Sequence, residues 1–201
     1  MTDTAWAERR LRSKLARIRG EDPSSPTFEA QKGSTMNQIT RQVILEAHKH
    51  VGVRETGGPN RGPEIDRWLF RVGSVPGQPW CAAFASCMLA DAFKALGLPL
   101  TVRLSASAHT LLERCQQAGG RAAEPGPGFL FGIDHGLGQQ GQKRGHCGIV
   151  VDVNPDGVHM TTIEGNTDRA GSREGQGVYQ LTRRIDEATL GFADPALLGH
   201  G

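Results

Sequence analysis

Cys81 is the residue best placed to act as a nucleophile. It follows the turn-forming stretch Gly77-Gln78-Pro79-Trp80 and begins a helical pattern. Apolar residues then recur at the three- and four-residue spacing of one helix face, at Phe84, Ala85, Met88, Leu89, Ala92, Phe93 and Leu96, before Gly97 and Pro99 end the run. The free N–H groups and the positive dipole end of a helix N-terminus stabilise a thiolate, the form that attacks carbonyl carbon.

A later hairpin carries a histidine with two polar neighbours. Asn154-Pro155-Asp156-Gly157 is typical of a type I turn followed by a left-handed glycine, in a three-residue loop that ends in a bulge. If Asn154 faces Val158, the register pairs Val150 with Thr162, Gly148 with Glu164 and His146 with Asn166. Because side chains alternate between faces, His146, Glu164 and Asn166 then project from the same face. A slip of one residue would separate them.

These residues supply the parts of a cysteine-dependent acyl transfer. The thiol needs an imidazole to take its proton, and the imidazole needs a polar partner that fixes its tautomer. Cys81, His146 and either Glu164 or Asn166 fill these roles. A single cysteine at a helix start more often serves packing, but its coincidence with a histidine and a polar pair on one hairpin favours catalysis.

Three stretches resemble the signature blocks of CHAP domains, the cysteine- and histidine-dependent amidohydrolases/peptidases. They are Pro79-Trp80-Cys81-Ala82-Ala83-Phe84, Gly145-His146-Cys147-Gly148-Ile149-Val150 and Ile163-Glu164-Gly165-Asn166, and the resemblance spans 38–195. CHAP domains are a papain-like branch of the NlpC-type peptidoglycan hydrolases. The resemblance implies a papain-like α+β fold, Cys81 as nucleophile, His146 as base and then acid, and Glu164 with Asn166 orienting the imidazole.

The oxyanion site and the cleft are assigned less directly. The N–H of Cys81 is one expected oxyanion donor, and Gln78 is the candidate for the second, although this glutamine could instead satisfy the backbone of its own turn. Asn60, in the Gly- and Pro-rich segment 57–63, and Trp80 are the other residues that we assign to the oxyanion site or the cleft.

Two departures from the family pattern concern substrate contacts more than the chemistry. Pro127-Gly128-Phe129 stands where many CHAP domains have a Gly-Asp pair, and the segment before His146 is long and rich in Gly and Gln. The acidic calcium loop of some phage CHAP domains has no match near Cys81. We therefore expect no metal and no cofactor.

The order of the predicted elements is helices first and sheet second. We expect helices over 38–51, 64–72 and from Cys81 to Leu96, and another that is capped by Ser105 or Ser107 and ends at Gly119-Gly120. Strands are predicted over 128–133, 147–153, 158–163, 178–184 and 190–193, with a loop over 136–145. This order is typical of an α+β fold, with the nucleophile helix packed on an antiparallel sheet.

Two domains are expected. Residues 1–35 form a basic helix, Trp6 to Arg19, and a flexible linker, and 36–201 form the CHAP-like catalytic domain. The basic helix is expected either to be solvated or to contact an anionic membrane or a partner.

The amino-acid composition limits the kinds of partner, metal and cellular location that we expect for this protein. The 201 residues carry 23 basic and 21 acidic side chains, a balance that gives no support to nucleic-acid binding. The four cysteines lack paired spacing, which favours reduced thiols over disulfides or zinc. The sequence shows no apolar signal segment, so we expect the protein to be made in the cytoplasm and to reach the cell wall by release or delivery. We also expect a monomer.

The leading functional hypothesis is hydrolysis of amide bonds in bacterial peptidoglycan. The enzyme would be an N-acetylmuramoyl-L-alanine amidase or a peptide endopeptidase, as in phage endolysins or delivered antibacterial effectors. Two alternatives stay open at this point: a non-catalytic wall-binding or structural module, and an intracellular cysteine peptidase or transferase that acts on a non-wall amide.

Overall fold

The computed structural model describes residues 38–172 and 175–198, so the expectations for residues 1–35 lie outside it. The described helices are one over residues 38–48, α3 (Pro63–Arg71), α4 (Cys81–Ala95) and α5 (Ala108–Cys115), which a π-turn over Gln116–Gly120 extends. Short 3-10 turns lie at Ile185–Glu187 and Pro195–Leu197. None of the helices described is both long and apolar enough to span a bilayer.

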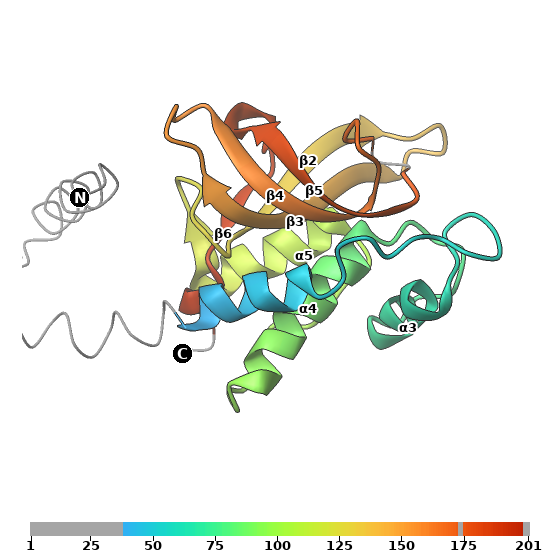
Figure 1. Cartoon of the computed structure of the whole chain (residues 1–201), viewed down its shortest axis with the longest axis horizontal. Helices are drawn as coiled ribbons and strands as arrows, with labels where there is room; N and C mark the ends of the chain where they lie inside the picture. The colour runs from blue at the N-terminus through green and yellow to red at the C-terminus, as the bar shows by residue number, and fades with distance from the viewer. Residues whose placement is uncertain (1–37, 173–174, 199–201) are drawn as a thin grey trace, which may run out of the picture. The chain divides into compact units, whose positions relative to one another are not determined.

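Within residues 38–172 and 175–198, six antiparallel strands form a single sheet in the order β1-β6-β2-β3-β4-β5. Their bounds are β1 Arg121–Ala122, β2 Leu130–Leu137, β3 Lys143–Val153, β4 His159–Thr167, β5 Gly177–Arg184 and β6 Gly191–Ala193. In Figure 1, helices α4 and α5 lie along one face of this sheet. The predicted α+β class, with the cysteine helix packed on an antiparallel sheet, is confirmed.

Helix α4 is the centre of the core. Of its 15 residues, 11 are buried, because apolar residues cover both the side toward the sheet and the side toward α3. Trp68 of α3 packs against Phe84 and Trp80, with ring centroids 5.2 and 5.6 Å apart. Gly97 ends the helix region in the left-handed conformation, with φ of 67°. This packing holds the first turn of α4 in place.

The register of the β3–β4 hairpin agrees with the prediction near the site and differs from it at the turn. Asn154 donates its N–H to the carbonyl of His159 at 2.9 Å, so it faces His159 and not Val158. A register shift between Val150 and Asp152 then absorbs the extra residue. Beyond this irregularity, Val150 pairs with Thr162 and Ile149 with Ile163, as expected.

Other element boundaries also differ from the predictions. The loop expected over 136–145 shrinks to 138–142, because β2 and β3 continue as a pair to Leu137 and Lys143. The first helix ends at residue 48 and not 51. Strand β1 was not predicted, since it has only two residues and exists through its pairing with β6. Ser107, one of the two proposed caps, accepts the N–H of Thr110 at the start of α5.

Candidate active site

Cys81 is the first residue of α4, as the sequence predicted. Trp80 precedes it as the N-cap residue, and no acidic side chain lies in the first turn to offset the positive end of the helix dipole. The cysteine exposes 5% of its surface, whereas His146 and Glu164 are fully buried. Cys81 is therefore the most solvent-accessible of these three residues.

His146 joins the cysteine to a carboxylate. It lies on β3, and its Nε2 is 2.7 Å from Oε2 of Glu164 on β4. The other ring nitrogen, Nδ1, is buried and makes no hydrogen bond of standard geometry with the described residues. The imidazole nevertheless interacts with the thiol of Cys81, and catalytic hydrogen bonds are often long without substrate. With Nε2 engaged by Glu164, Nδ1 is the nitrogen left to take the thiol proton.

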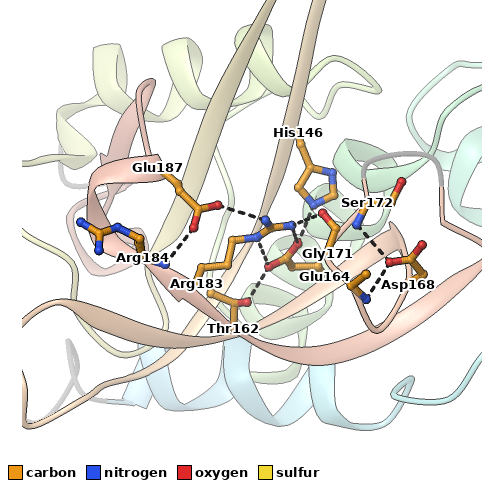
Figure 2. A network of polar contacts seen from close by, with 10 residues as sticks. His146, Thr162, Glu164, Asp168, Gly171, Ser172, Arg183, Arg184 and Glu187 are labelled. Atoms are coloured by element: carbon orange, nitrogen blue, oxygen red, sulfur yellow. Dashed lines mark hydrogen bonds and ion pairs between the residues drawn. The ribbon is translucent and has the colours of Figure 1, made fainter.

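Glu164 is held on three sides. Thr162 donates its hydroxyl to Oε1 at 2.5 Å, and Arg183 of β5 donates Nε to Oε1 and Nη2 to Oε2, each at 2.8 Å. Figure 2 shows the contacts of the carboxylate with both the guanidinium and the imidazole. Such a bidentate pair fixes the plane of the carboxylate as well as its charge.

The charges of the site favour a thiolate and an imidazolium. A hydrogen bond with the Cys147 thiol, together with the neighbouring His146, holds the pKa of Cys81 well below its usual range despite burial. Burial lowers the pKa of His146, but Cys81 and Glu164 outweigh it and raise this pKa to about 9. Burial raises the pKa of Glu164, but His146 and Arg183 outweigh it and lower this pKa to about 2.

The other three cysteines lie in the described part of the chain and stay thiols. Burial raises the pKa of Cys87 and of Cys115 to about 12. The pKa of Cys147 is also raised, by its hydrogen bond with Cys81 and by burial. Cys81 is thus the single cysteine that ionises readily, as a nucleophile must.

Replacing Cys147 by alanine is expected to weaken the Cys81 thiolate, because it removes a hydrogen-bond donor to this sulfur. The pH midpoint of Cys81 alkylation by iodoacetamide should move to higher pH. Cys115→Ala, which also removes a buried thiol, should leave the midpoint in place. An unchanged midpoint in Cys147→Ala would show that the contact between the two sulfurs does not support the thiolate.

The remaining predicted residues have different surroundings. Asn166 is buried near the end of β4 with a φ of 57°, two residues beyond Glu164, and its role stays a prediction. Gln78 is exposed in the turn before α4, and Asn60 is half-buried with a φ of 56°. Both stay candidates for substrate contact. Among the described residues, no three His, Cys, Asp or Glu side chains gather as metal ligands would.

Trp80 does not fit its assignment to the oxyanion site or the cleft. Its side chain is fully buried, and its indole Nε1 donates to Glu55 at 3.0 Å. Gly165 of β4 lies against this ring, since a Cβ there would be 2.7 Å from it. The tryptophan is therefore a core residue that fixes the chain immediately before Cys81.

Sequence reasoning missed Arg183 and the position of Cys147. Cys147 was predicted on the buried face of its strand, and it is buried there, but nothing in the sequence placed its sulfur against Cys81. Arg183 was predicted within a strand. Its contact with Glu164 depends on the register between β4 and β5, which is continuous from the His159–Arg184 pair to the Glu164–Tyr179 pair. A charged residue near the end of a predicted strand was the only available signal.

A cysteine at the start of a helix, with a histidine and a carboxylate on the sheet packed against that helix, is the arrangement of papain-like proteins. Residues 73–166 match the family model described as CHAP domain, and this range contains Cys81, His146, Glu164 and Asn166. The region that holds the site is therefore similar to CHAP domains, a family of peptidoglycan amidases and peptidases, which are hydrolases.

One similar solved structure is "The crystal structure of Ly7917", at 18% sequence identity and a TM-score of 0.42. The alignment covers 78% of this chain and 62% of that one, so the chain spans less than two thirds of its length. The search of curated proteins found no match.

Proposed function

We propose that this protein hydrolyses amide bonds of bacterial peptidoglycan with Cys81 as the nucleophile. The observation that supports this most directly is the buried series Cys81, His146 and Glu164, which begins at a helix N-terminus and favours a thiolate beside an imidazolium. A structural or wall-binding module has no need of these perturbed pKa values. The family match supports the substrate class.

In the proposed reaction, the thiolate of Cys81 attacks the amide carbonyl carbon and forms a tetrahedral oxyanion. The backbone N–H of Cys81 stabilises this oxyanion, with Gln78 as the candidate second donor. His146 gives its proton to the leaving amine, and the acyl group stays on the sulfur as a thioester. The neutral imidazole then takes a proton from water, and the water oxygen attacks the thioester carbon. The C–S bond breaks, the carboxylic acid product leaves, and the Cys81 thiolate and the His146 imidazolium are restored. Glu164 and Asn166 hold the imidazole in place.

The substrate bond is either the link between N-acetylmuramic acid and L-alanine or a bond within the stem or cross-bridge peptides. We propose the setting of a phage endolysin or of an antibacterial effector delivered to other cells, which acts at the wall after release. Contact of residues 1–35 with an anionic membrane would assist such delivery.

The direct test is incubation of the full chain with purified cell walls, followed by mass spectrometry of the released fragments. An amidase would release free peptides that start with L-alanine, whereas an endopeptidase would release disaccharides with shortened or uncrosslinked stems. Cosedimentation with the walls and no new amino groups would overturn the hydrolase proposal in favour of a binding module.

Activity should depend on pH with a bell shape. The alkaline limb is expected near the His146 pKa of about 9, because loss of the imidazolium proton removes the acid that protonates the leaving amine. The acid limb marks protonation of Cys81 and should lie well below the range of an ordinary thiol. Initial rates across pH, with an uncharged chromogenic or fluorogenic amide, measure both limbs. A rate that keeps rising above the His146 pKa would contradict this assignment.

A further inference from the structure

The guanidinium of Arg183, which is largely buried, lies beside the carboxylate of Glu164. The side chain of Arg183 is 11% exposed, and its guanidinium is paired with both oxygens of Glu164. On β5, Arg183 pairs with Met160 and Tyr179 pairs with Glu164, so Arg183 projects from the same face of the sheet as the carboxylate. In Figure 2, this guanidinium lies beside the carboxylate of Glu164, which also contacts the imidazole.

The contacts of Glu164 show why this cation matters. Oε2 is shared between His146 Nε2 and Arg183 Nη2, and Oε1 is shared between Thr162 and Arg183 Nε. The two hydrogen bonds from Nε and Nη2 of Arg183 mainly set the plane of the carboxylate. This plane determines the direction from which Oε2 contacts the imidazole. A lysine could supply the charge but not this planar geometry.

The charges of the buried side chains also indicate that Arg183 supports the ionised form of Glu164. The thiolate, imidazolium, carboxylate and guanidinium alternate in sign and sum to zero in a site that is almost fully buried. Without the guanidinium, this series would carry a net negative charge at low dielectric. Protonation of Glu164 is the easiest relief, and a neutral acid stabilises the imidazolium less.

Arg183 also contacts the loop that follows β4. Its Nη2 donates to the carbonyl of Gly171 at 2.9 Å, and its Nη1 donates to Glu187 at 3.2 Å. Within this loop, Asp168 accepts the N–H groups of Ala170 and Ser172. The same guanidinium thus contacts both the carboxylate of Glu164 and the backbone of Gly171.

We propose that Arg183 is a positioning residue, which keeps Glu164 ionised and aligned so that Glu164 can hold the His146 imidazolium beside the Cys81 thiolate. This inference deepens the proposed function and rests on it. Arg183 does not touch the reacting atoms, so its influence must pass through Glu164.

The test compares Arg183→Gln and Arg183→Lys with the matched control Arg184→Gln. Arg184 is the next residue on β5, but its side chain is 56% exposed and pairs with Asp186. For Arg183→Gln, kcat on an amide substrate should fall by about 10- to 100-fold with little change in KM, the effect expected of a misplaced catalytic group. Arg183→Lys should recover part of kcat, and Arg184→Gln should match the wild type.

Alkylation of Cys81 separates positioning from a general structural defect, and it needs no wall substrate. In Arg183→Gln, the pKa of Glu164 should rise, so the acid limb of the alkylation profile should move to higher pH. A merely loosened fold would lower or raise the rate at all pH values together. This readout also tests the proposal if the protein does not cleave peptidoglycan.

Removing one partner of a buried ion pair can unfold a protein, so the thermal melting temperature of each variant is measured as a control. A double variant completes the test. In the Glu164→Gln background, Arg183→Gln should cause little further loss of alkylation rate or kcat, because the residue through which it acts is already neutral. The proposal is overturned if the two losses multiply, if a folded Arg183→Gln keeps the wild-type profile, or if Arg184→Gln is equally impaired.

Discussion

Cys81→Ala is expected to abolish amide hydrolysis, with a loss of roughly 10⁴-fold or more in kcat. The reason is chemical, since alanine cannot form the thioester and nothing nearby can replace it. Cys147 is the nearest thiol, but its pKa is raised and it donates a hydrogen bond to Cys81. Release of soluble fragments from purified cell walls measures the effect.

Cys115→Ala is the matched control for this variant. It also removes one buried sulfur, but from α5, where the thiol pKa of about 12 excludes a role as nucleophile. It should retain activity at wild-type levels, and Cys81→Ala should melt at a temperature close to that of the wild type. Undiminished clearing of walls by a folded Cys81→Ala variant would end the proposal of a cysteine nucleophile.

His146→Ala should have the second largest effect, a loss of roughly 10³- to 10⁴-fold in kcat, near the upper end of what one general acid–base contributes. The variant loses both the acceptor of the thiol proton and the donor to the leaving amine. The pH profile of Cys81 alkylation should also move toward that of an ordinary thiol, since the imidazolium no longer stabilises the thiolate.

The fold should survive His146→Ala, because Glu164 keeps its ion pair with Arg183. His159→Ala is the control, since this histidine lies on the neighbouring strand β4 but is paired with Asp156 at the surface. It should leave hydrolysis and alkylation unchanged. If His146→Ala keeps the acid-shifted alkylation profile, the Cys147 contact and the helix dipole alone would account for the reactive thiolate.

The β3–β4 hairpin shows how a local error can leave a functional prediction intact. The turn was misplaced by one residue, because Asn-Pro-Asp-Gly is compatible with more than one loop length. The irregularity between Val150 and Asp152 offsets this slip before the strands reach the site. Alternation of side chains then brings His146 and Glu164 to the same face, so their 2.7 Å contact agrees with the sequence-based expectation.

Predictions that depended on one segment alone were the most accurate. The helix start at Cys81 follows from a turn joined to an apolar period. The pairing of His146 with Glu164 was also predicted, but it depends in addition on the irregularity between Val150 and Asp152, which restores the expected register. Trp80 was misassigned because proximity in sequence to the nucleophile does not show whether a side chain points to solvent or to the core.

The sequence by itself thus determined which residues could form the nucleophile, the base and its carboxylate partner, because each depends on a period that the chain imposes locally. Only the tertiary structure decided that the Cys147 sulfur meets Cys81 and that Arg183 pairs with Glu164. These contacts join different elements, whose relative positions depend on strand pairing and on the packing of the helix against the sheet. No spacing within a single element encodes them.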